Sequence, residues 1–254
     1  MEDRPVKVLF LGETWAVTKI HTKGFDTVKL GGFDDMSVYL KGALADDDNI
    51  DVTHLPNHLV LSEFPESQSE LDEYDVVIVS DTGRNTLTMY PDMFTVPMGP
   101  NRLKMIKQFV EKGGGFIMAG GYVCFQGFQG KGNYHDSEIE EILPVEISDR
   151  DDRVEAPEGV RPEITDPEHE ILSGVPSDDW PRFLGYNRLT SKDEATVLSE
   201  IKEGDPFITV WEYGGGRTMA FASDLAPHWG TDFVNWDYYD SFWRQSIRWL
   251  AGES

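Results

Sequence analysis

Three short apolar runs constrain the fold of this chain more than any other feature. They cover residues 6–11 (VKVLFL), 75–80 (DVVIVS) and 115–119 (GFIMA), and each is as short and as rich in β-forming residues as a buried strand. Residues 36–45 and 101–112 repeat apolar side chains at helical spacing. Because neighbouring parallel strands need a crossover, which is usually a helix, this alternation predicts a parallel sheet covered by helices on both faces.

The C-terminal part of the chain follows a different pattern. Residues 196–201 and 207–213 are strand candidates, and residues 214–216 (GGG) form a turn from which residues 217–223 return as a further strand. The sequence therefore predicts a β-hairpin here. Residues 238–250 (YYDSFWRQSIRWL) place large apolar side chains on one broad face, which predicts a terminal helix.

Two further segments complete the predicted architecture. Residues 50–55 alternate apolar and polar side chains, which suits a strand near a sheet edge. Residues 148–167 are charged and contain three prolines, so we expect a long surface excursion that stays with the domain. The 254 residues fit one large α/β unit and include no internal repeat or low-complexity linker, which predicts a single domain over residues 1–254.

Charge and composition exclude several classes of partner. The chain has 22 Lys and Arg against 46 Asp and Glu, and the net charge of −24 repels the phosphates of nucleic acids and anionic lipids. Apolar runs stay below the roughly 18 residues that a bilayer crossing needs, so we expect neither nucleic acid nor a membrane as a partner. The dispersed acidic residues favour adaptation to concentrated salt over an ordinary acidic mesophilic protein. The single cysteine, Cys124, fits a reducing cytoplasm, where we expect the protein to be located.

Polar and aromatic side chains follow each predicted parallel strand. Since ligands of open parallel sheets bind outside the carboxyl ends of the strands, these side chains are the candidates for a small-molecule site. In chain order they are Glu13, Trp15, Asp81, Arg84, Asn85, Gly120, Gly121, Tyr122, Gln126 and Trp229 for ligand binding, with Cys124, Asp224 and His228 for catalysis.

A thiol nucleophile is the sharpest enzymatic hypothesis. Cys124 follows a strand and a double-glycine turn, and His228 could act as its base while Asp224 or Asp232 orients the imidazole. A nucleophile elbow, however, carries its nucleophile on the turn itself, which here is residues 120–122 (GGY). Cys124 comes later and between apolar neighbours, which favours a packing role.

Other motifs give no cofactor or metal site. Residues 113–115 (GGG) precede a strand, whereas a phosphate cradle opens a helix after one. His54 and His58 are separated by Pro56, which disfavours a helical metal pair. The aromatic residues between 229 and 249 could form a sugar platform, but their helical spacing favours packing of the terminal helix.

Several segments resemble a known family. They are residues 74–81 (YDVVIVSD), 120–122 (GGY) with Phe125 and Gly127, Lys131 with residues 133–134 (NY), 142–145 (ILPV), 151–154 (DDRV), 183–187 (FLGYN), and 223–224 (SD) leading to 227–230 (PHWG). The chain is similar over most of its length to the glutamine amidotransferase-like proteins, a class I branch of flavodoxin-type folds that includes uncharacterised cytoplasmic proteins. The resemblance implies a flavodoxin-like, doubly wound, mainly parallel α/β sheet with a C-terminal β-hairpin and a terminal helix.

The resemblance also bears on activity. Amidotransferases of this class carry a glycine-flanked cysteine on the elbow and a histidine followed two residues later by glutamate. Only His228 matches, because Gly121 lies on the elbow and Gly230 replaces the glutamate. We therefore predict that the Cys–His–Glu glutaminase triad is absent and that a small ligand or a partner binds at the strand ends. The alternative is an amidase with His228 as base and Cys124 or water as nucleophile. A homo-oligomer remains open.

Overall fold

The computed structural model describes residues 4–95, 98–201 and 204–253. Its central element is an eight-stranded sheet with the strand order β4-β1-β5-β6-β14-β13-β12-β9. The first five strands of this order are parallel and the last three are antiparallel additions. The bounds are β1 (Val6–Gly12), β4 (Ile50–Leu55), β5 (Val76–Ser80), β6 (Gly115–Ala119), β9 (Glu163–Ile164), β12 (Thr196–Ile201), β13 (Asp205–Tyr213) and β14 (Gly216–Phe221).

The parallel strands confirm the predicted fold class. Taken in chain order, they are arranged 2-1-3-4-5, which is the flavodoxin-like order of a doubly wound sheet. The predicted edge strand at 50–55 is β4, and the predicted C-terminal hairpin is β13 with β14. All five residues of β5 and all five of β6 are buried, as expected for strands covered on both faces.

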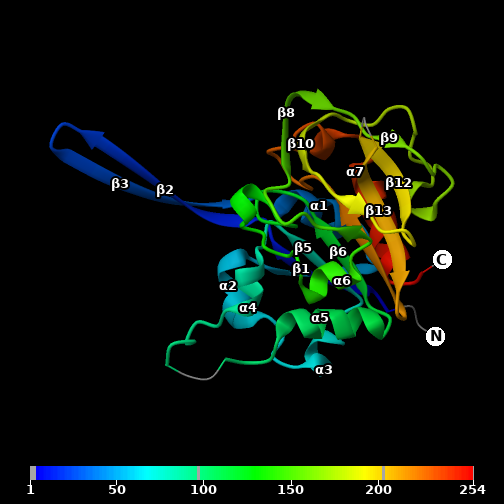
Figure 1. Ribbon diagram of the computed structural model, residues 1–254, viewed down its shortest axis with the longest axis horizontal. Coiled ribbons are helices and arrows are strands. Elements are labelled where there is room, and N and C mark those ends of the chain that lie inside the picture. The colour runs from blue at the N-terminus through cyan, green and yellow to red at the C-terminus, as the bar shows by residue number, and fades with distance from the viewer. Residues whose placement is uncertain (1–3, 96–97, 202–203, 254) are drawn as a thin grey trace.

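Helices cover the sheet (Figure 1). α1 (Val38–Ala45) packs against the terminal helix α7 (Tyr239–Leu250), and α5 packs against α3, α4 and α6. The remaining bounds are α2 (Asn57–Glu63), α3 (Gln68–Leu71), α4 (Arg84–Thr88), α5 (Arg102–Glu111) and α6 (Glu138–Ile142). Among the described residues, no helix combines the length and the hydropathy that would let it span a bilayer.

Local hydrogen bonds explain where two predicted helices begin. The Asn101 side chain accepts hydrogen bonds from the backbone N–H groups of Leu103 and Lys104, at 3.0 and 3.1 Å, and so caps α5. α1 begins two residues later than the predicted helix at 36–45, because the Met36 N–H is bound to the Glu13 carbonyl at 2.8 Å. Asp35 accepts a hydrogen bond from the Ser37 N–H at 3.0 Å, which holds the turn before the helix.

Residues 148–167 lie largely at the surface, as predicted, but contain strands that the sequence pattern did not indicate. β8 (Arg153–Val160) pairs with β10 (Phe183–Asn187), and β9 forms an edge of the main sheet. A second small pair joins β7 (Val145–Glu146) to β11 (Thr190–Ser191). Asp152 is buried because backbone N–H groups and an amide surround its carboxylate. The sequence could not indicate that Asp152 is buried, because residue type alone does not distinguish a buried, hydrogen-bonded carboxylate from a solvated one.

The largest departure from the predicted architecture follows β1 directly. β2 (Thr14–Lys23) and β3 (Asp26–Asp35) form an antiparallel ribbon that projects away from the rest of the molecule (Figure 1). We call residues 14–35 the arm. Apolar, basic and glycine residues alternate irregularly along it, so neither face carries a clear period-two pattern, and no strand was predicted there.

Candidate functional site

The carboxyl ends of four parallel strands bring acidic side chains together. Glu13 follows β1, Asp81 follows β5 and Asp224 lies beyond β14, while the Gly120-Gly121 bend follows β6. The junction of β1 and β5 is the point at which the strand order reverses, where flavodoxin-like folds bind their ligands. We call Glu13, Asp81, Gly121, Asp224 and His228 the rim.

Two rim carboxylates crowd the double-glycine bend. A Cβ atom on Gly121 would lie 2.7 Å from Oδ1 of Asp81 and 2.8 Å from Oδ1 of Asp224. Gly121 also has a φ of 137°, which side-chain-bearing residues rarely adopt. Gly120 is equally confined, because a Cβ there would lie 2.6 Å from Oδ1 of Asn187. The bend therefore has no room for a nucleophilic side chain.

Burial shifts the protonation of all three rim carboxyl groups. Loss of solvent and, secondarily, the neighbouring Asp224 raise the pKa of Asp81 to about 7, against the opposing effect of a hydrogen bond from the Val123 N–H at 3.2 Å. Burial also raises the pKa of Asp224, and burial together with both aspartates raises the pKa of Glu13 well above its usual range. Ser80 donates a hydrogen bond to Glu13 at 2.5 Å. The rim thus holds protons at neutral pH.

Asp224 and His228 form a hydrogen-bonded pair. Nδ1 of His228 lies 3.0 Å from Oδ2 of Asp224, which also accepts the Trp229 N–H at 2.8 Å. The hydrogen bond to Asp224 raises the pKa of His228. His228 has a φ of 122°, and strained backbone of this kind concentrates at functional sites. Its ring contacts that of Tyr122, with 4.6 Å between centroids. The topology therefore brings the imidazole beside the double-glycine bend.

Glu155, on β8, fixes the aromatic residues around His228. It accepts hydrogen bonds from the Tyr122 hydroxyl at 2.8 Å and from Nε1 of Trp229 at 3.1 Å. Glu155 was not among the predicted site residues, because it lies in a charged segment whose composition is typical of surface. The segments 151–154 (DDRV) and 183–187 (FLGYN), which carried the family resemblance, could have indicated this part of the site. Asn187 accepts a hydrogen bond from the Gly121 N–H at 2.9 Å and donates one to Asp152 at 2.8 Å, so both residues hold the double-glycine bend.

Cys124 lies in the core. Its side chain is fully buried, and Sγ is 4.0 Å from the Val79 carbonyl oxygen. Burial, reinforced by the nearby Asp81, raises the pKa of the thiol well above its usual range. A thiol that stays protonated is a poor nucleophile, because the thiolate is the reactive form.

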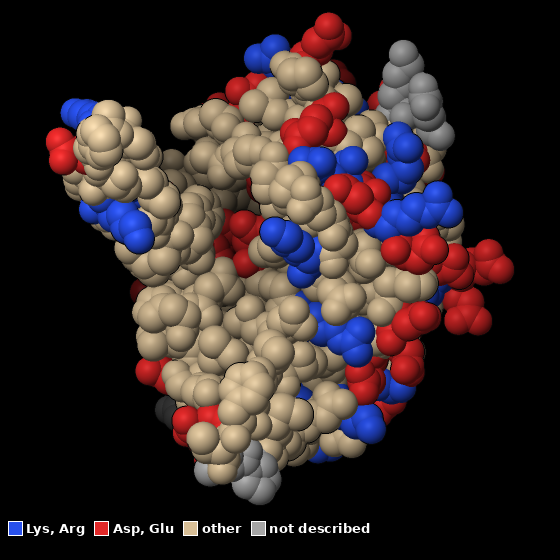
Figure 2. Space-filling view, turned by 60° about the vertical axis from the view of Figure 1, so that its left-hand side comes forward, with Lys and Arg blue, Asp and Glu red and all other residues tan. Residues whose placement is uncertain are grey.

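A cavity of about 770 Å³ opens between the rim and the base of the arm. Figure 2 shows this hollow beside the projecting arm, with acidic side chains at its floor. Of the ligand-binding candidates, Trp15, Asp81, Asn85 and Tyr122 line it. The other lining residues were not among the ligand-binding candidates and are Thr14, Ala16, Phe33, Asn57, His58, Gly83, Thr86, Val123 and Lys131.

The remaining candidates lie elsewhere. The Arg84 side chain turns to the Asn133 carbonyl oxygen, with a hydrogen bond of 3.4 Å. Gln126 is buried and contacts the Asp149 carbonyl oxygen at 3.5 Å. Trp229 is fully buried behind Tyr122, with 5.6 Å between the ring centroids. His54 and His58 have different surroundings, since His54 contacts the Gly12 carbonyl oxygen at 2.9 Å whereas His58 lines the cavity.

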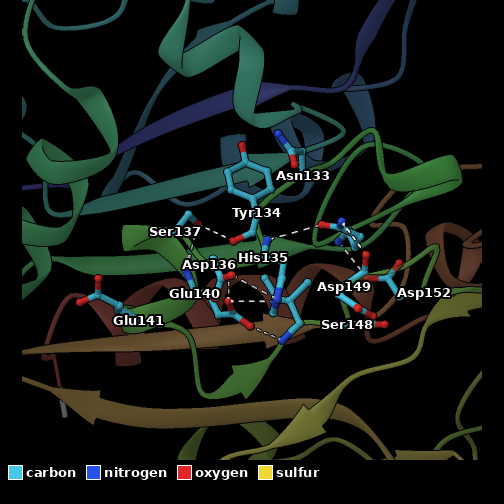
Figure 3. Close-up of polar contacts among 12 residues, drawn as sticks. Asn133, Tyr134, His135, Asp136, Ser137, Glu140, Glu141, Ser148, Asp149 and Asp152 are labelled. Carbon is cyan, nitrogen blue, oxygen red and sulfur yellow. Dashed lines mark hydrogen bonds and ion pairs between the residues drawn. The ribbon is translucent and has the colours of Figure 1, made fainter.

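One other group of side chains has the composition of a metal site. In the described part of the chain, only His135, Asp136 and Glu140 bring three such ligand atoms within 4.8 Å of one another (Figure 3). The Glu140 carboxylate accepts backbone N–H groups from Asp136 and Ile147, both at 2.6 Å, while Ser137 caps α6. These bonds are those of a helix start, which accounts for the cluster without a metal.

Comparison with known proteins identifies the family. A family model described as "Putative glutamine amidotransferase" matches residues 7–252. The chain belongs to this glutamine amidotransferase-like family. The prediction made from the quoted segments is thereby confirmed. No curated protein matches the chain.

Solved structures extend the comparison. Two proteins of Salmonella typhimurium, both named cytoplasmic proteins, share 40% and 38% identity with this family member at TM-scores of 0.92 and 0.91. Each alignment covers 96% of this chain and 99% of the Salmonella chain. A ThuA-like protein from Parabacteroides merdae, at 13% identity and a TM-score of 0.58, shares the fold alone. None of these names states a reaction.

Proposed function

We propose that this amidotransferase-like protein binds a small amine in the cavity beside the rim and does not hydrolyse glutamine through a cysteine. The proposal rests on the double-glycine bend, which has no room for a nucleophilic side chain. The carboxylates of Asp81 and Asp224 occupy the space that a nucleophile's Cβ on Gly121 would need. Cys124, the chain's only cysteine, is buried as a protonated thiol.

The cavity walls suggest the chemistry of the ligand. Trp15, Phe33 and Tyr122 supply aromatic surface, and Asp81 supplies a carboxyl group whose pKa is about 7. An ammonium group beside Asp81 would favour its ionised form, and aromatic faces attract cations. A compound with an apolar ring and a primary amine on a short chain matches this arrangement.

A matched pair of probes tests the proposal. We expect 2-phenylethylamine to bind at least about tenfold more tightly than 2-phenylethanol at pH 8, because only the amine gains a charge-assisted hydrogen bond to Asp81. Isothermal titration calorimetry measures both affinities. Asp81→Asn should remove the difference, whereas Asp136→Asn, at an exposed carboxylate outside the cavity, should preserve it. Failure of the amine to bind, or equal binding of the two probes, contradicts the proposal.

The pH dependence of binding gives a second test. Below pH 7 Asp81 holds a proton, which must leave before the carboxylate can pair with an ammonium group. Affinity for 2-phenylethylamine should therefore rise as the pH increases from 5.5 to about 8. In Asp81→Asn the profile should be flat over the same range.

The Asp224–His228 pair supports a second function, hydrolysis of a small amide by water. In this reaction Nε2 of His228 takes a proton from a water molecule, whose oxygen forms a bond to the amide carbon. The C–N bond then breaks, and protonated Asp81 gives its proton to the departing amine. An Asp–His hydrogen bond fixes the tautomer that such a base needs.

Substitutions separate water-dependent hydrolysis from the thiol mechanism. We expect any hydrolysis of small 4-nitroanilides to fall at least about 100-fold in His228→Gln, since general-base catalysis contributes about that much. Cys124→Ala should retain full activity. Loss of activity in a folded Cys124→Ala variant would restore the thiol mechanism, and absence of hydrolysis in the unmodified protein would leave ligand binding as the function.

A further inference from the structure

We propose that the arm, residues 14–35, docks on the acidic body of a second copy of this chain and so makes the protein a homo-oligomer. The arm projects from the molecule as a two-stranded ribbon (Figure 1). In the described part of the chain, β2 and β3 pair only with each other, so each has an outer edge free of strand partners.

The arm exposes apolar side chains on both faces. Ile20 is 61% exposed, Leu30 is 52% exposed, and Phe25 at the tip is fully exposed. Cross-strand register places Ile20 opposite Lys29 on one face and Leu30 opposite Lys19 on the other. A two-stranded hairpin without a covering layer is marginally stable in water. Apolar side chains on both faces therefore indicate that the ribbon is covered in the assembled protein.

Charge identifies the covering surface. Over the whole arm three lysines are balanced by Asp26, Asp34 and Asp35, but the last two lie at its base. The projecting residues 16–33 contain three lysines and one aspartate, a net charge of +2, so the rest of this chain of net charge −24 carries −26. The lysines stand out on the arm in Figure 2. The projecting residues 16–33 of two arms would repel each other, whereas these residues and the acidic body of another copy attract. The charge distribution thus favours contact between the arm of one copy and the body of another.

The reach of the arm agrees with this contact. Ten residues in each strand span about 33 Å, which is enough to cross onto a neighbouring molecule. The base of the arm also supplies Trp15 and Phe33 to the cavity wall. An arm held by a second copy would therefore fix one wall of the ligand cavity.

Matched charge reversals test the proposal in the full chain. In 150 mM salt we expect the unmodified protein to sediment as a dimer or larger oligomer at micromolar concentration. Lys19→Glu with Lys29→Glu should weaken association at least about tenfold. The control pair, Lys104→Glu with Arg150→Glu, makes the same change in net charge at exposed positions of the body and should leave association unchanged. A monomer at 100 μM, or equal weakening by both pairs, overturns the proposal.

Cross-linking distinguishes the two possible contacts of the arm. A carbodiimide joins lysine amines to carboxylates that touch them, and a mixture of ¹⁴N- and ¹⁵N-labelled protein separates links between chains from links within one chain. We expect mixed-isotope links from Lys19, Lys23 or Lys29 to acidic residues of the body. Links to Asp26 of another arm alone, or the absence of any mixed-isotope link from these lysines, overturn the proposal.

Discussion

The rim and the arm depart in opposite ways from the usual distribution of side chains. The rim buries Glu13 and Asp224 and half-buries Asp81 beside them, whereas the arm, which begins one residue after Glu13, leaves large apolar side chains in water. Proteins commonly bury apolar groups and leave charges exposed, because each reversal costs free energy. Both neighbouring regions therefore lower the free energy of unfolding of the single chain. The proposed amine binding concerns the rim, and the proposed association concerns the arm.

The two regions differ in what can reduce their cost in free energy. A proton or a bound cation can neutralise the carboxylates of the rim, while only another molecule can cover the apolar side chains of the arm. Substitutions should accordingly change the free energy of unfolding of the single chain strongly at the rim and weakly in the arm. The following predictions test that difference, beginning with the largest expected effect.

Gly121→Ala should lower the free energy of unfolding by about 4 kcal/mol, since the new Cβ would overlap two carboxylates and φ is 137°. Gly31→Ala, at an arm position with no atom within 4 Å of the new Cβ, should change it by less than about 0.5 kcal/mol. Urea denaturation measures both. Similar values for the two variants would remove the distinction between the regions.

Asp81→Asn should raise the free energy of unfolding at pH 8 by about 2 kcal/mol. Between pH 4 and 7 the folded chain keeps a proton that the unfolded chain releases, so Asp81 destabilises the fold progressively as the pH rises through this range. The difference between the pKa of Asp81 in the folded chain and its ordinary value corresponds to about 4 kcal/mol of destabilisation at pH 8. Removal of the charge recovers this free energy, but burial of the new amide offsets part of the gain. Urea midpoints at pH 4 and pH 8 measure the effect, and an equal gain at both would contradict it.

Cys124→Ala should lower the free energy of unfolding by about 1 kcal/mol, as expected when a small buried side chain loses one atom. Because Cys124 belongs to the core beneath the rim, the affinity for 2-phenylethylamine should not change. Calorimetry of the folded variant checks this. A loss of affinity would show that Cys124 contributes to the ligand site and not only to the core.

Ile20→Thr with Leu30→Thr should have the smallest effect on the single chain, below about 0.5 kcal/mol, since both side chains already contact water. Urea denaturation at nanomolar concentration, where association is weakest, provides the measurement. A loss of several kcal/mol would show that the arm is packed on its own body.

Particular elements show how far the sequence could be interpreted. β4, β6 and β12 lie where residue periodicity predicts them, and α5 lies within the predicted helix at 101–112. The arm was missed because its alternation is mixed on both faces. Glu155 was missed because its bonds to Tyr122 and Trp229 join residues 33 and 74 positions apart. Local periodicity carries no information about such distant contacts.

The sequence by itself determined the five parallel strands, the C-terminal hairpin and helix, the absence of a cysteine on the elbow and the acidic charge. These depend on residue type and on spacing over a few positions, which fix burial and local backbone geometry. Only the tertiary structure decided that two carboxylates fill the elbow, that Asp224 holds His228 beside Tyr122, and that the arm leaves the body. Each of these depends on distances between segments that meet only when the sheet closes, and on the loss of solvent that follows.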